Sequence, residues 1–193
     1  MTDVKLQRAG RLALTLALAA YGVSYARDPG AGRLIDGVDL AIHESGHLVF
    51  GALGEFVQFA GGTLMQLLMP LAFVGYFVRR RDPHAATVAL WWVAQNLWNV
   101  SVYVADARAQ ELPLVGGGEH DWAYMLGRLG LMARDTAIAR GVHHAGVALL
   151  VVSTVAGVYF ALQAGGGESD DTRATFYDAE SPAARGGRRE AAA

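Results

Sequence analysis

Residues 59–78 read FAGGTLMQLLMPLAFVGYFV and contain no charged side chain. As a helix, this stretch reaches about 30 Å, which is the thickness of the hydrocarbon core of a bilayer. Residues 85–105 and 145–162 are also free of charge. We expect helix in all three stretches, because an isolated strand in lipid would leave its backbone hydrogen-bonding groups unpaired.

Two weaker segments accompany these three. Residues 12–26 are apolar but short and follow basic residues, a pattern of a first membrane helix or of a cleaved signal peptide. Residues 38–53 are apolar apart from five polar side chains, which must face protein or a water-filled cavity if the segment enters a membrane. We therefore predict an all-α, polytopic membrane bundle of about four to five membrane segments over residues 1–164. Residues 165–193 are rich in Gly, Ala, Ser, Asp and Arg, which is typical of a disordered tail.

The composition agrees with a membrane protein and excludes several classes. Of the 193 residues, 53% are hydrophobic and 18% are charged, which is too apolar for an ordinary soluble domain. The net charge of −2 gives no basic excess of the kind that nucleic-acid-binding proteins carry. The chain has no cysteine, so any transition metal must be held by His, Asp or Glu. Membrane lipid is the expected surrounding, and the inner membrane of a bacterial-type cell the expected location.

Charge alone does not fix the membrane orientation. Arg79, Arg80 and Arg81 follow the first apolar stretch and favour the cytoplasmic side. If every segment spans, Lys5 and the basic residues after it then fall on the opposite side. The conflict disappears if one of the two weak segments does not cross the membrane completely.

The motif that carries chemistry is His43-Glu44-Ser45-Gly46-His47, an HExxH sequence. On a helix, residues four apart share a face, so both imidazoles can reach one Zn²⁺. Glu44 is then placed to accept a proton from a metal-bound water and to pass it to a leaving amine. Asp39, four residues before His43, is expected either to fix the tautomer of that ring or simply to favour the helix N-terminus. Gly46 lets another backbone approach the motif closely.

A catalytic zinc needs a third protein ligand, for which the sequence offers several candidates. Asp121 and His120 come first, because they combine two strong ligand types after a glycine loop. Asp106 comes second, and His143 or His144 third. The sequence does not separate these candidates.

A polar stripe runs along the stretch 85–105. Asn96, Asn99, Tyr103 and Asp106 lie on one face of the expected helix. Polar groups in lipid need a partner, and the HExxH face is the obvious one. Asn96 and Asn99 are candidates to hold a substrate strand or its oxyanion, and a plain hydrogen-bonded seam between helices is the alternative.

The sequence His43-Glu44-Ser45-Gly46-His47-Leu48-Val49-Phe50 resembles the zinc-binding helix of the site-2 protease family of intramembrane metallopeptidases. Members carry HExGH in a membrane helix and cleave peptides in or near the membrane. The resemblance implies that His43 and His47 bind zinc and that Glu44 is the catalytic base. That family takes its third ligand from a later LDG-type motif, and no such motif follows here.

The leading hypothesis is a membrane-embedded zinc metallopeptidase that acts on a peptide or membrane-protein substrate. A di-iron oxygenase or desaturase is an alternative, because His120 and the pair His143-His144 loosely match the histidine boxes of those enzymes. Such enzymes use about eight histidines and this chain has six. A non-catalytic metal-binding or regulatory membrane protein is the third hypothesis.

Overall fold

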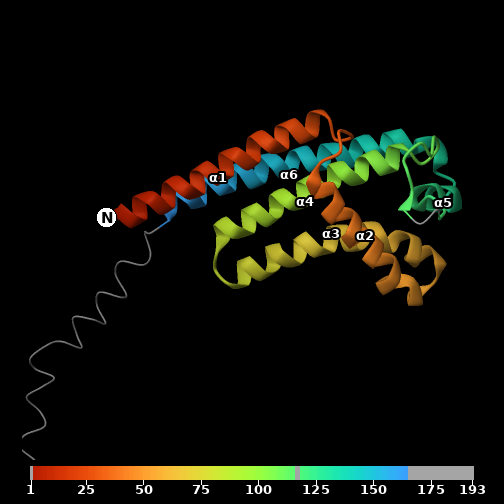
Figure 1. Cartoon of the computed structure of the whole chain (residues 1–193), viewed down its shortest axis with the longest axis horizontal. Coiled ribbons are helices and arrows are strands. Elements are labelled where there is room, and N and C mark those ends of the chain that lie inside the picture. Colours follow the sequence, from red (N-terminus) through yellow and green to blue (C-terminus); the bar gives the residue numbers. More distant parts are fainter. Residues whose placement is uncertain (1, 116–117, 165–193) are drawn as a thin grey trace, which may run out of the picture.

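The computed structural model describes residues 2–115 and 118–164, and the regular structure within those ranges is helical (Figure 1). Short 3-10 turns precede α3 and α6. The predicted all-α class is confirmed for these ranges, whereas the tail predicted for residues 165–193 lies outside them. The α-helices are α1 (Thr2–Arg27), α2 (Leu34–Phe50), α3 (Glu55–Arg79), α4 (Pro83–Ala105), α5 (Asp121–Arg128) and α6 (Asp135–Gln163).

Local sequence explains where α3 and α4 begin. Gly54 precedes α3 with φ of 103°, a conformation that side chains with a Cβ rarely adopt. Asp82 caps α4 because its Oδ1 accepts a hydrogen bond from the backbone N–H of Ala85 at 3.1 Å. Pro83 occupies the first turn of α4, where its missing N–H costs nothing.

The long helices α1, α4 and α6 pack along one another and enclose the main core (Figure 1). Its buried members are Tyr25, Trp91, Ala94, Trp98 and Leu150. Each large apolar side chain buried in this way contributes about 1.5–3 kcal/mol. A Cβ on the glycine at position 146 would lie 2.6 Å from the indole Nε1 of Trp98, so α6 can approach α4 only because that residue lacks a side chain.

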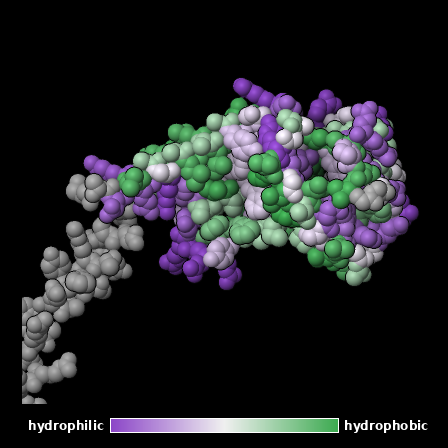
Figure 2. Space-filling model, in the orientation of Figure 1, coloured by the Kyte–Doolittle hydropathy of each residue, from purple (hydrophilic) through white to green (hydrophobic). Residues whose placement is uncertain are grey.

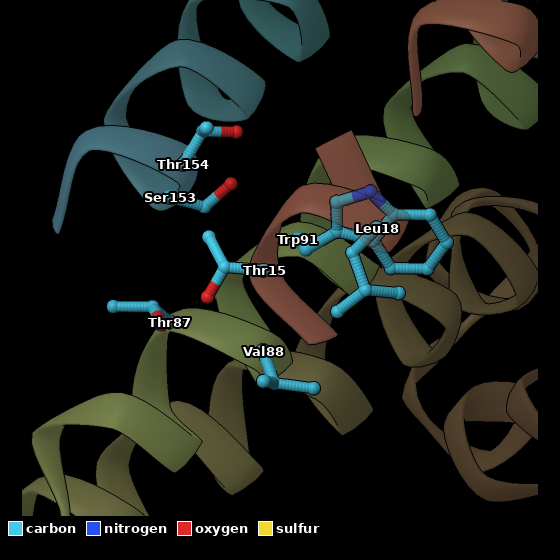
Figure 3. A pocket seen from close by; sticks show the side chains of 7 residues that line it. All are labelled: Thr15, Leu18, Thr87, Val88, Trp91, Ser153 and Thr154. Atoms are coloured by element: carbon cyan, nitrogen blue, oxygen red, sulfur yellow. The ribbon is translucent and has the colours of Figure 1, made fainter. Parts of the chain in front are cut away.

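A small cavity of about 10 Å³ remains between α1, α4 and α6 (Figure 3). Four hydroxyl-bearing residues line it, and three of them donate a hydrogen bond to a carbonyl of their own helix: Thr15 to Arg11, Thr87 to His84, and Ser153 to Leu150. The space is large enough for about one water molecule. It is a packing defect among the long helices, and none of the HExxH residues lines it.

The packing of α2 on α3 depends on glycine. A Cβ on Gly46 would lie 2.1 Å from the carbonyl oxygen of Gly61, a distance too short for the Cβ of any residue. A Cβ on Gly61 would in turn lie 2.7 Å from the carbonyl oxygen of Gly46. The close approach predicted for Gly46 is therefore confirmed, and it brings the backbone of α3 directly against the HExxH motif.

The helices place the basic segments at one end of the molecule. Arg8 donates from Nε to the carbonyl oxygen of Ala164 at 2.8 Å, and Arg11 lies 3.8 Å from Asp82. These contacts join the start of α1 to the α3–α4 turn and to the end of α6, as Figure 1 also shows. Both basic segments lie at the same end of the molecule because α1 and the 17-residue α2 run in succession toward the far end before α3 returns.

Two helical segments, Glu55–Arg79 and Met132–Gln163, are long and apolar enough to cross a membrane. In each, only 28% of the most apolar stretch is buried within the protein, so most of it faces outward. Figure 2 shows hydrophobic surface over much of the middle of the molecule, with hydrophilic atoms gathered toward its ends. Among the described residues no other helix passes the same test, so a bundle of four to five membrane segments stays a prediction.

Candidate metal centre

The two histidines of the motif converge on one carboxylate. The Nε2 atoms of His43 and His47 lie 2.9 Å and 3.3 Å from the same oxygen, Oδ2 of Asp121. His43 and Asp121 are buried, and His47 is partly exposed. Asp121 begins α5, 78 residues along the chain from His43. Of the candidates for the third ligand, it is the one that the fold brings to the HExxH motif.

The other ring nitrogen of each histidine, Nδ1, forms a hydrogen bond with an oxygen of α3. Nδ1 of His43 donates to Oε1 of Gln66 at 3.2 Å, and Nδ1 of His47 donates to the carbonyl oxygen of Gln58 at 2.8 Å. With the ring hydrogens on Nδ1, the lone pairs are on Nε2 and point at Asp121. Metal-binding histidines are usually oriented by such a second hydrogen bond.

This donor set suits Zn²⁺. Two imidazole nitrogens and one carboxylate oxygen are a usual protein contribution to a catalytic zinc site, which keeps one position open. Ligands at 2.0–2.1 Å in a tetrahedron are about 3.3 Å apart, and the two separations that involve Asp121 are close to this value. The ligand atoms of His43, Glu44 and His47 also all lie within 4.8 Å of one another.

Glu44 lies where two cavities meet. Each cavity has a volume of about 310 Å³. Glu44, Tyr103, Leu114 and Val115 line both of them. A carboxylate at this junction, next to the two imidazoles, can exchange a proton with a molecule held in either cavity.

The two cavities differ in character. The one that also contains His47 is lined by further carboxylates, Glu55 and Glu119. Glu55 accepts a hydrogen bond from the hydroxyl of Tyr124 at 2.8 Å. Partial burial and this bond raise the pKa of the Tyr124 hydroxyl. The cavity that also contains His43 is lined mainly by apolar side chains, among them Leu40 and Leu112.

Two candidates for the third ligand contact each other and not the HExxH histidines. His120 precedes α5 and caps it, because its Nδ1 accepts a hydrogen bond from the backbone N–H of Ala123 at 3.3 Å. Its Nε2 lies 3.3 Å from Oδ2 of Asp106. The carboxylate of Asp106 also accepts from the backbone N–H groups of Glu111 and Leu112, at 2.9 Å and 3.1 Å.

Asp39 does not contact His43, contrary to one of the roles expected from the sequence. Its two carboxylate oxygens accept from Nε1 of Trp92 at 3.0 Å and from Nε2 of Gln95 at 2.7 Å. The side chain points into α4, where it is fully buried. Gln66 of α3 takes the place beside His43.

The polar stripe of α4 is divided between two environments. Asn99 faces the candidate site, because its Oδ1 accepts from Gln66 at 2.8 Å and the residue lines the cavity beside His43. Tyr103 also faces it, with its ring centroid 5.7 Å from that of His43. Asn96 is buried, lines neither cavity and donates to Gln95, so its predicted role in holding substrate stays a prediction without a contact to either cavity.

The pair His143-His144 lies on α6, away from the HExxH motif. The carbonyl oxygen of His143 accepts from the indole of Trp98 at 3.2 Å, and the His143 ring lies 6.5 Å from the same indole, tilted by 48°. Among the described residues, His43, Glu44 and His47 form the one cluster of three or more such groups that could hold a metal.

No family model, curated protein or solved structure matches the chain. The likeness of residues 43–50 to the site-2 protease family therefore stays a prediction that depends on the motif. The convergence of His43, His47 and Asp121 is independent of that likeness, since it comes from the packing of α2 and α5 on α3.

Proposed function

We propose that this chain is a membrane-embedded zinc metallopeptidase that hydrolyses peptide bonds in or near the membrane. The observation that carries the proposal is the approach of His43 Nε2 and His47 Nε2 to one oxygen of Asp121, with Glu44 beside them. Both imidazoles already use their other nitrogen as a donor, so this face is free to bind a cation. A purely structural metal site would not need the glutamate.

The residues divide the chemistry among them. His43, His47 and Asp121 would hold Zn²⁺, which lowers the pKa of a bound water to about 7 and polarises a peptide carbonyl. Glu44 accepts the proton of the attacking water as the new carbon–oxygen bond forms. It then delivers that proton to the nitrogen as the carbon–nitrogen bond breaks, which releases an amine and a carboxylic acid.

The surroundings of the site favour a substrate close to the membrane. The outward faces of α3 and α6 are apolar, which fits lipid contact along both helices. The metal centre lies on the end of the bundle that contains α5, opposite the end with Arg79, Arg80 and Arg81 (Figure 1). If those arginines are cytoplasmic, as the charge rule predicts, the centre is near the outer surface of the membrane.

The experiment measures metal and activity on the same detergent-purified protein. We expect about one zinc per chain in the wild type, none in the double variant His43→Ala/His47→Ala, and an unchanged content in Glu44→Gln. Cleavage of a quenched fluorescent peptide library should fall about 100-fold or more in Glu44→Gln. Glu55→Gln is the matched control, because Glu55 lines the same cavity without approaching the histidines.

The outcomes separate the proposal from its alternatives. Wild-type cleavage in Glu44→Gln would refute the catalytic assignment. Zinc bound by His43 and His47 with no cleavage of any peptide would favour a non-catalytic regulator. Iron at about two atoms per chain would favour an oxygenase.

A further inference from the structure

The side chains of Tyr103, Asp106 and His120 hold the start of α5, and none of them is a proposed metal ligand. The ring of His120 is completely buried and packs 4.2 Å, centroid to centroid, from the ring of Tyr103. The hydroxyl of Tyr103 accepts a hydrogen bond from the backbone N–H of Asp121 at 3.3 Å. The position of Asp121 therefore depends on the placement of these two rings.

Asp106 fixes the orientation of the His120 ring. Nδ1 of His120 accepts from Ala123, so in the neutral ring the hydrogen is on Nε2. Asp106 Oδ2 is 3.3 Å from that nitrogen, a charge contact that is not a hydrogen bond, and Nε2 has no hydrogen-bond partner among the described residues. Removing the negative charge would take away the electrostatic attraction between the carboxylate and the buried N–H group, which is the contact that orients the ring.

The same carboxylate holds the segment that walls the cavities. Its oxygens accept the N–H groups of Glu111 and Leu112, which lead directly into Leu114 and Val115. One buried side chain thus joins the end of α4, the cavity wall and the N-terminus of α5.

We propose that Asp106 and His120 are positioning residues, which act through the first turn of α5 to hold Asp121 against the two HExxH histidines. This inference rests on the proposed function, because it takes Asp121 as a metal ligand. Asp106 and His120 were candidate metal ligands in the sequence. In this inference they do not bind the metal and instead position the residue that does.

The test uses full-length protein in detergent and two readouts besides activity. The first is hydrogen exchange of the backbone amides of Leu112 and Ala123 in metal-free protein. The second is the affinity and visible absorption spectrum of bound Co²⁺, which reports the geometry of the ligands. In Asp106→Asn, we expect faster exchange at both amides, a cobalt affinity about 10–100-fold lower, and a changed spectrum.

The matched control is Asp135→Asn. Asp135 is also a buried carboxylate, and it binds Arg108, two residues after Asp106, without contacting His120. Its replacement should leave cobalt affinity within about twofold of the wild type. His120→Asn tests the same link from its other side. Asparagine can still cap α5, so this variant keeps the inference testable even if Asp106→Asn fails to fold.

The outcomes distinguish the inference from the proposed function. Unchanged exchange in Asp106→Asn, or faster exchange with wild-type cobalt affinity and spectrum, would overturn the positioning role alone. An equal loss of affinity in Asp135→Asn would show that general destabilisation is responsible, and would overturn it too. A wild type that binds no cobalt would overturn the proposed function and the inference together.

Discussion

Gly62 offers a sharp test of the metal centre, because its Cα lies directly under a ligand. A Cβ at this position would be 2.4 Å from Nε2 of His43 and 2.6 Å from two carbons of the same ring. Ordinary contact begins at about 3.4 Å, so in Gly62→Ala the ring must retreat by about 1 Å. Metal–ligand distances tolerate about 0.2 Å, so His43 would be lost as a ligand.

The size of the effect follows from this displacement. Losing an outer partner of a ligand costs about 10–100-fold in metal affinity, and losing the ligand itself should cost more than about 100-fold. Helix propensity works in the opposite direction, because alanine stabilises a helix interior by about 1 kcal/mol relative to glycine. A loss of binding therefore cannot come from weakening α3.

The assay is zinc affinity by competition with a chromogenic chelator. Gly75→Ala is the control, since Gly75 lies in the same helix and a Cβ there would meet nothing within 4 Å. We expect control affinity equal to the wild type and much weaker binding in Gly62→Ala. Equal affinity in the two alanine variants, both folded by circular dichroism, would refute the placement of His43 as a metal ligand.

Three further predictions concern other parts of the structure. Gln66→Ala removes the acceptor of the Nδ1–H group of His43, so zinc affinity should fall about 10–100-fold while saturating zinc still gives one metal per chain; unchanged affinity would contradict this. Asp39→Ala removes the acceptor of the Trp92 indole and one of the acceptors of Gln95, and should lower the free energy of unfolding by about 1–3 kcal/mol in denaturant titrations, with no change in zinc affinity of the folded protein. The third prediction uses single introduced cysteines, which is possible because the chain has no cysteine of its own. Since the basic ends lie together, cysteines at positions Lys5 and Arg80 should both be protected from an impermeant maleimide in intact cells, and a cysteine at Glu119 should be labelled. Opposite labelling at Lys5 and Arg80 would show that the two basic segments do not share an end.

The helical fold could be predicted from the sequence, because long uncharged stretches leave few other structures open to the backbone. The role of Gly46 was predictable for a similar reason, since a glycine inside a motif helix has few uses other than close approach. The HExxH spacing likewise determines which two imidazoles share a face. These features depend on residues near one another in the chain.

The remaining features depend on packing between distant segments. Asp121, His120 and Asp106 are all strong ligand types, and only the packing of α2 and α5 on α3 distinguishes the first from the other two. Asp39 sits four residues before His43, yet its carboxylate turns toward α4, where Gln95 and an indole supply donors. The part played by Gln66 also needed the structure, although an uncharged polar side chain within an apolar stretch was the signal available for it.

The separation of the ligands along the chain has a consequence for biosynthesis. His43 and His47 are synthesised early, but Asp121 follows His43 by 78 residues. At 5–20 residues per second, a nascent chain carries the two imidazoles for about 4–16 s before the carboxylate exists. During that interval α1, α2 and most of the helices that support the site can enter the membrane while the centre has only two of its ligands. The proposed peptidase, assembled in this order, would stay latent until its own synthesis is nearly complete.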